Sequence, residues 1–183
     1  MIGAAFGAML ARAQNGDEAA FGCIFRDVQP ALLRYLRVIA RDAEDVAGDT
    51  WVQVVTGLAG FRGEEQAFRA WLFTIARHRA VDAGRHRARH PELPLEMRET
   101  VEQPRSPDTA DVVLEAFSAR AAVALIARLP RDQAEIIMLR VVAGLDTADV
   151  ARMVGKKPGA VRVAAHRGLR RLAELAERTG VTP

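Results

Sequence analysis

The segment from Leu145 to Leu172 carries the residues whose types and spacing are most informative about chemistry. It reads LDTADVARMVGKKPGAVRVAAHRGLRRL. Seven Lys or Arg residues and no acidic residue lie between Arg152 and Ala173. A helix that carries only positive charge repels itself unless a polyanion lies against it. The charge pattern therefore predicts contact with nucleic acid.

The same segment has the spacing of two helices joined by a tight turn. Ala151 is small enough for close helix approach, and Val161 can pack the second helix against the first. Gly155 supplies the left-handed residue that ends the first helix. Asp146 is the expected N-cap of the first helix, and Pro158 suits the first turn of the second. These features predict a helix-turn-helix whose second helix enters the major groove of DNA.

The second helix has two expected faces. The face turned to the protein is expected to carry Val161, Ala165, Leu169, Leu172 and Ala176. The residues expected to contact duplex DNA are Lys156, Lys157, Arg162, Val163, His166, Arg167 and Arg170. Arg162, Val163 and His166 lie nearest the helix start, so we expect them at base edges. The later arginines are expected to meet phosphates.

Aromatic and basic residues alternate between residues 61 and 89. We expect most of the rings to be core residues. Basic residues beside exposed rings also suit single-stranded nucleic acid, because bases stack on rings while arginines hold the backbone. The loop at residues 60–66, which contains Phe61, is the candidate for receiving an unstacked base.

Acidic residues crowd the start of an expected helix at residues 42–55. Asp42, Glu44 and Asp45 stabilise a helix N-terminus by their charge alone. The alternative interpretation is an acidic, partly apolar face for a partner protein, which would include Val46 and Asp49. Both interpretations remain open at this point.

The periodicity predicts an all-α protein of two small helical domains. The first domain is expected at residues 1–90, with helices at 4–14, from Asp17 onward, at 42–55 and at 67–89. The second, at 111–183, is expected to be a four-helix domain containing the helix-turn-helix. Between them lies a flexible Pro-rich linker at 91–110, within a stretch (91–115) that has seven acids against two arginines.

Several function classes have no support in the sequence. There are no clustered carboxylates, no Cys/His metal spacing and no Gly-rich phosphate loop, so we expect neither an enzyme nor a metal or cofactor. Cys23 is the single cysteine, so no internal disulfide can form. No apolar stretch approaches the roughly 20 residues of a membrane span. We therefore expect a cytoplasmic protein without membrane insertion.

The chain resembles bacterial sigma factors of the extracytoplasmic-function (ECF) class. DAEDVAGDTWVQVV resembles the helix that grips the clamp of core RNA polymerase. FRAWLFTIARHRAVDAGRHRAR resembles the helix that melts and reads the −10 promoter element. The segment from Leu129 to Leu172 resembles the domain that reads the −35 element as duplex. Both resemblances occur in the expected order and together span nearly the whole chain.

The resemblance implies a role for individual residues. The residues it places on polymerase are Asp45, Val46, Asp49 and Trp51, to which the acidic cluster adds Asp42. The residues it places at the melted −10 strand are Arg62, Arg69, Arg77, His78, Asp82 and Arg85, to which the loop adds Phe61. His78 stands where the family more usually has Asn, and Gly48 where it usually has a polar residue.

The function implied is that of a sigma factor, which directs transcription by binding core RNA polymerase and two promoter elements. Promoter DNA and core polymerase are thus the expected partners, and short members of the family often have an anti-sigma factor as well. The alternative is a stand-alone helix-turn-helix regulator. That alternative predicts palindromic half-sites and tight DNA binding without polymerase.

Overall fold

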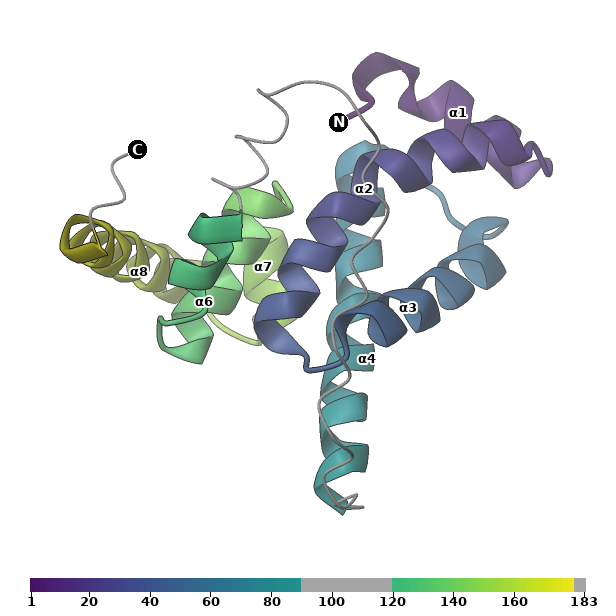
Figure 1. Ribbon diagram of the computed structural model, residues 1–183. Helices are drawn as coiled ribbons and strands as arrows, with labels where there is room; N and C mark the ends of the chain where they lie inside the picture. The colour runs from purple at the N-terminus through teal and green to yellow at the C-terminus, as the bar shows by residue number, and fades with distance from the viewer. Residues whose placement is uncertain (90–119, 180–183) are drawn as a thin grey trace, which may run out of the picture.

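The computed structural model describes residues 1–89 and 120–179, and these residues form helices and no strand (Figure 1). The expected all-α class is confirmed. The expected linker at 91–110 and the expected start of the second domain near Asp111 lie outside the described residues. Within the described ranges, no helix is both long enough and apolar enough to cross a membrane.

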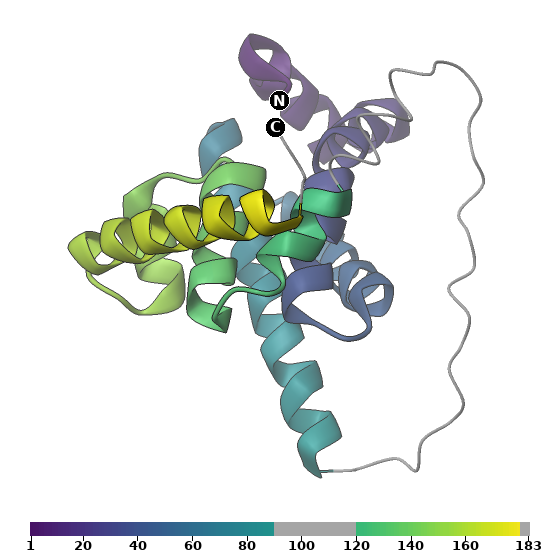
Figure 2. The ribbon, with the colours of Figure 1, turned by 60° about the vertical axis from the view of Figure 1, so that its left-hand side comes forward.

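Four α-helices build the first half. They are α1 (Phe6–Gln14), α2 (Glu18–Ile39), α3 (Ala43–Leu58) and α4 (Glu65–Arg89), and a short 3-10 helix, η1 (Gly3–Ala5), precedes α1. α2 packs against α1, α3 and α4, and α3 also packs against α4. The C-terminal turns of α4 extend beyond the other helices in both ribbon views (Figures 1 and 2).

Local signals set the boundaries of these helices. α1 ends at Asn15, and Gly16 follows with a φ of 87°, a conformation that favours glycine. The Asp17 carboxylate accepts a hydrogen bond from the backbone N–H of Ala20 at 3.0 Å, as an N-cap does. The expected end of the first helix and the expected cap of the second are both confirmed.

The second half contains a helical stretch at residues 120–126, then α6 (Arg131–Ile137), η2 (Met138–Val142), α7 (Thr147–Val154) and α8 (Pro158–Thr179). η2 is a π-helix that continues α6. α8 packs on both α6 and α7 and lies across them in the second view (Figure 2). This is the expected helical unit around a helix-turn-helix.

The helix-turn-helix has the expected caps. Asp146 accepts a hydrogen bond from the Asp149 N–H at 2.7 Å and so caps α7. Gly155 ends α7 with a φ of 68°, and α8 begins at Pro158. Ala151 and Val161 are buried where the two helices meet.

The prediction of which α8 residues face the protein is wrong at one position. Leu169 is 48% exposed, and its neighbour Gly168 faces the protein instead. A Cβ at Gly168 would lie 2.6 Å from Ile137 Cδ1 and 3.3 Å from Gln133 Cβ. α8 therefore approaches α6 too closely for a side chain at this point.

The two halves pack against each other through α2 and α4 on one side and α6, η2 and α7 on the other. Their buried apolar residues form one continuous core. Tyr35 from α2 and Phe73 from α4 are buried in it and meet edge to face, with ring centroids 5.4 Å apart. We call this packing of the two halves the closed arrangement.

Candidate nucleic-acid interface

The turn before α8 and the first part of α8 form a basic, exposed surface. All seven residues that the sequence predicts at duplex DNA are exposed: Lys156, Lys157, Arg162, Val163, His166, Arg167 and Arg170. Burial of Val161 fixes the rotation of α8, because Arg162 and Val163 must then point away from α7. The helix-turn-helix thus turns these side chains to the solvent as a group.

Two of these cations have acidic partners within the second half. Lys156 Nζ lies 2.6 Å from an Asp132 carboxylate oxygen, and Arg170 lies 3.5 Å from Glu174. The Lys156 ammonium lowers the pKa of Asp132. Both carboxylates are well exposed, so these ion pairs contribute little stability and can yield to phosphates.

Val163 adds an apolar contact to the basic surface. Its side chain is 49% exposed and lies between arginines on the outer face of α8. An apolar side chain in the major groove suits the methyl group of thymine. The surface can therefore combine phosphate attraction with some reading of bases.

Four of the residues predicted at the −10 strand, on α4 and in the loop before it, are exposed: Arg62, His78, Asp82 and Arg85. Asp82 and Arg85 form an ion pair at 3.7 Å along the helix. Arg62 precedes α4 and donates to the carbonyl oxygens of Ala59 and Phe61 at 2.8 and 2.7 Å. These contacts hold its guanidinium over the loop.

Phe61 is half-buried and belongs to an aromatic cluster. Its ring stacks on Trp71 with centroids 5.0 Å apart and meets Phe68 edge to face at 5.5 Å. One face of the ring is therefore covered by Trp71. This cluster anchors the loop before α4, and any base stacking on Phe61 has to use its other face.

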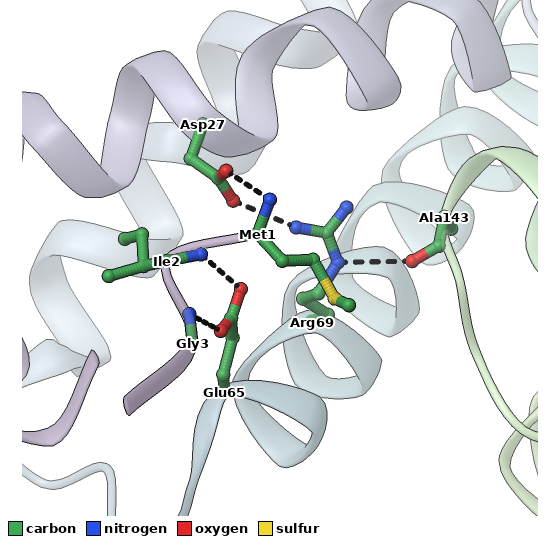
Figure 3. Close-up of polar contacts among 7 residues, drawn as sticks. All are labelled: Met1, Ile2, Gly3, Asp27, Glu65, Arg69 and Ala143. Atoms are coloured by element: carbon green, nitrogen blue, oxygen red, sulfur yellow. Dashed lines mark hydrogen bonds and ion pairs between the residues drawn. The ribbon is translucent and has the colours of Figure 1, made fainter. Parts of the chain in front are cut away.

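Arg69 is buried, with only 6% of its side chain exposed, and lies between the two halves. Its Nε donates to the carbonyl oxygen of Ala143 at 3.0 Å, and another guanidinium nitrogen donates to Asp27 at 3.0 Å (Figure 3). Asp27 also pairs with the amino group of Met1 at 2.7 Å. In the closed arrangement Arg69 is thus inaccessible to DNA.

The N-terminal residues also pack against α4. The carboxylate of Glu65 accepts hydrogen bonds from the backbone N–H groups of Ile2 and Gly3 at 3.0 and 2.7 Å (Figure 3). Glu65 lies in the first turn of α4, where a negative charge also complements the helix dipole. The start of the chain is thereby held beside Arg69.

Arg77 also contacts the second half. Its Nε donates to the Glu135 carboxylate at 2.8 Å, and the same oxygen accepts from the Tyr35 hydroxyl at 3.3 Å. The Glu135 side chain is 13% exposed. Glu135 was absent from the sequence-based predictions, because its two partners lie 58 and 100 residues away and leave no local signal.

The environment of Tyr35 predicts a measurable pH effect. Burial, and then the Glu135 carboxylate, raise the pKa of its phenol well above the ordinary 10.0. The unfolded chain therefore ionises this phenol first, so its stabilising contribution is complete below pH 10 and is lost as the pH rises further.

We expect the wild type to lose stability faster than Tyr35→Phe above this pH. Tyr35 is the only tyrosine, so tyrosinate absorbance reports it alone. We expect that signal to appear together with unfolding, as followed by circular dichroism. Ionisation at the ordinary pKa in a protein that stays folded would contradict the buried contact.

On α3, the predicted polymerase contacts divide between surface and core. Val46 and Trp51 are buried, and the Trp51 indole N–H donates to Gln29 at 2.6 Å, so both are structural residues here. Asp45 and Asp49 are exposed. Asp42 precedes the helix without a side-chain capping bond and forms an ion pair with Arg87 of α4.

Two exposed residues beside these acids were not predicted from the sequence. Val52 and Val55 are 68% and 55% exposed on α3. Their residue type suggests core, and only the rotation of the helix reveals that they face the solvent. The exposed face of α3 therefore combines Asp45 and Asp49 with two valines, as a protein-binding surface does.

Known proteins match this chain over nearly its whole length. The family described as Sigma-70 region 2 matches residues 24–90, and Sigma-70, region 4 matches residues 119–172. The ECF RNA polymerase sigma factor ShbA of Streptomyces griseus is 37% identical in an alignment that covers 93% of this chain and 95% of ShbA. The chain belongs to the ECF class of RNA polymerase sigma factors.

Other relatives agree with this assignment. The ECF sigma factor SigD of Mycobacterium tuberculosis is 35% identical, with 95% of this chain and 85% of SigD covered. The sigma factor RpoE of Bartonella quintana, solved with the anti-sigma factor NepR, has the same fold, with a TM-score of 0.62 at 24% identity over 86% of this chain and 96% of that one. CnrH, solved with the cytosolic domain of CnrY, also has this fold, with a TM-score of 0.60 at 23% identity. The match covers 95% of this chain and 98% of the CnrH chain.

The family assignment decides between the two functions considered from sequence. Sigma factors are DNA-binding transcription initiation factors that act with core RNA polymerase, and the stand-alone regulator is not supported. The region 2 match covers most of α2 together with α3 and α4, and the region 4 match ends within α8. The basic first turns of α8 thus lie within region 4.

Proposed function

We propose that this sigma factor reads the −35 element as duplex through the first turns of α8. The observation that carries the proposal is the exposed group of Arg162, Val163, His166 and Arg167 on α8, with Lys157 exposed just before the helix. Arg162, Val163 and His166 contact base edges, and the other cations contact phosphates. A helix of this kind fits the major groove with its N-terminal residues at the bases.

The exposed face of α4 contacts the melted −10 strand in this proposal. Arg62, His78, Asp82 and Arg85 are exposed in the closed arrangement. Arg69 is buried, and the Nε of the partly exposed Arg77 is occupied by Glu135, so separation of the halves frees the Nε–H groups of both arginines. The domains that carry the two DNA sites are residues 1–90 and 111–183, joined through 91–110. Tethering both to one polymerase raises their effective concentration at a correctly spaced promoter.

Core polymerase binds the exposed face of α3, where Asp45 and Asp49 are followed by Val52 and Val55. The sigma factor itself is not an enzyme, because the polymerase supplies the chemistry, and it acts in the cytoplasm with that polymerase. An anti-sigma factor is a further proposed partner, by analogy with the complexes of RpoE with NepR and of CnrH with CnrY.

A mobility-shift assay with promoter DNA tests this proposal. We expect the free sigma factor to bind a double-stranded promoter fragment weakly, and the complex with core polymerase to bind it tightly. Tight binding by the free protein to a palindromic site would favour a stand-alone regulator instead. A competing fragment with a scrambled −35 element provides the control.

The α3 surface predicts the effect of a charge change. Asp45→Asn together with Asp49→Asn is expected to weaken core binding by roughly 0.4–2 kcal/mol, since each exposed ion pair contributes about 0.2–1 kcal/mol. Affinity measured by fluorescence anisotropy checks this. The control is Glu18→Gln with Glu177→Gln, which removes the same charge from exposed sites elsewhere. Equal losses in both double variants would remove α3 from the interface.

A further inference from the structure

The closed arrangement is held by hydrogen bonds at two places as well as by the shared core. At one, Glu135 of α6 accepts from Arg77 and Tyr35 of the first half. At the other, Arg69 of α4 donates to the Ala143 carbonyl of the second half. Hydrogen bonds that involve a charged group are stronger than neutral ones. Glu135 thus connects the two halves through a carboxylate that is 13% exposed.

The second contact lies where the α6–η2 helix ends. The last carbonyls of a helix lack partners within it and carry partial negative charge. The Ala143 carbonyl receives the Arg69 guanidinium, and the Gly144 carbonyl receives the Gln66 amide at 3.1 Å. Two consecutive turns of α4 therefore cap a helix end of the other half.

The closed arrangement is too small to reach both promoter elements. The −10 and −35 positions are about 25 base pairs apart, which is about 85 Å along the duplex axis. A compact chain of this length has a radius of gyration of roughly 16 Å and so spans about 40 Å. The two DNA surfaces of a closed molecule cannot occupy both elements together.

We propose that Glu135 and the Ala143 carbonyl are an intramolecular latch that competes with the promoter for Arg77 and Arg69 and holds the sigma factor in a closed, −10-incompetent state. This inference rests on the proposed function, because it takes both arginines as contacts of the melted strand. Opening transfers each guanidinium from a protein oxygen to a DNA oxygen. Promoter reading is thereby coupled to separation of the halves.

The competition follows from the chemistry of the arginine side chain. A guanidinium presents its N–H groups in a fixed plane and binds carboxylate and phosphate oxygens in the same manner. Arg77 cannot hold Glu135 and a strand phosphate through the same Nε–H. The exposed residues His78 and Arg85 have no such contact with the described residues of the second half, so closure leaves them accessible. Closure buries Arg69 and occupies the Nε–H of Arg77.

The distance between the halves tests the proposal directly. Fluorophores are attached at Ala19→Cys on α2 and Glu177→Cys on α8, both exposed positions, with Cys23→Ser to remove the native thiol. We expect high energy transfer in the free protein and a clear fall in the transcribing complex with core polymerase. If the complex transcribes but its energy transfer equals that of the free protein, the latch is overturned and the proposed function remains intact. Absence of any complex with core would overturn both.

The latch residue is tested by Glu135→Gln, which keeps the size of the side chain and removes its charge. The apparent affinity for core polymerase is proportional to the fraction of sigma molecules that are open. Glu135→Gln weakens the latch and raises this fraction, so we expect the core concentration for half-maximal opening to decrease about tenfold. The matched control is Glu44→Gln, which breaks the Arg37–Glu44 pair (2.9 Å) inside the first half and leaves the latch intact. Without core polymerase, the energy transfer between the two fluorophores in this control is expected to equal that in the wild type.

A second variant keeps the test valid if Glu135→Gln fails to fold. Tyr35→Phe removes only the hydroxyl that donates to Glu135, and circular dichroism verifies its helix content. We expect it to open at a lower core concentration than the wild type, in the same direction as Glu135→Gln. An opening midpoint unchanged in the folded latch variants would overturn the assignment.

Discussion

Arg162→Ala is expected to lower the affinity of the polymerase–sigma complex for its promoter by about 1–3 kcal/mol, or roughly 5- to 150-fold. Arg162 is exposed in the first turns of α8, and the burial of Val161 beside it fixes its direction. A guanidinium there can bind the edge of a guanine with two hydrogen bonds. We therefore expect the loss to be concentrated at one base pair of the −35 element.

Binding to promoters that carry each base at each −35 position checks this prediction. The control is Arg178→Ala, which removes the same charge from the far end of the same helix. It is expected to change the salt dependence slightly and the base preference not at all. If Arg162→Ala weakens every sequence equally, Arg162 contacts a phosphate and the base assignment is wrong.

Gly168→Val is expected to destabilise the fold by about 1–3 kcal/mol, the usual cost of overpacking a filled site. Already a Cβ at this position would lie 2.6 Å from Ile137 Cδ1 and 3.3 Å from Gln133 Cβ. Ile137 is buried, so its side chain has little freedom to move aside. The two helices must separate, which also moves the recognition surface of α8 relative to α6.

Urea unfolding followed by circular dichroism measures this cost. Gly84→Val is the matched control, because Gly84 lies within α4 and a Cβ there meets nothing within 4 Å. Its cost is expected to be small, since valine suits a helix no worse than glycine does. Equal losses for the two variants would show that the close approach of α8 to α6 is unimportant for stability.

The helix-turn-helix was predictable from sequence because its signals are local. Asp146 and Gly155 act within a few residues of their positions, through a capping bond and a left-handed backbone. A basic run without acids is likewise visible in the sequence alone. These signals correctly predicted the boundaries of α7 and the start of α8.

The rotation of α8 was predicted less well. Steps of four residues from Val161 lead to Leu169, whereas the packed face runs through Gly168. A helix has 3.6 residues per turn, so a contact face alternates steps of three and four. Leucine also appears a better core residue than glycine until the closeness of α6 is known.

The contacts between the halves could not be predicted from sequence. Arg69 and Arg77 lie in a basic stretch that resembles a DNA-contacting surface, and their partners Ala143 and Glu135 are 74 and 58 residues away. On α3, Val46 and Trp51 resemble partner contacts, yet both belong to the core. In each case a residue type suited to binding has a structural contact that depends on the tertiary fold.

Transcription in vitro is the most direct test of the central claim. Core RNA polymerase is supplied with genomic template DNA, with and without this protein, and the 5′ ends of the RNA are mapped. The account predicts new start sites that require the protein and share two upstream elements, and their loss with Arg162→Ala. Start sites that are identical in its presence and absence, from polymerase that is active with another sigma factor, would contradict the account.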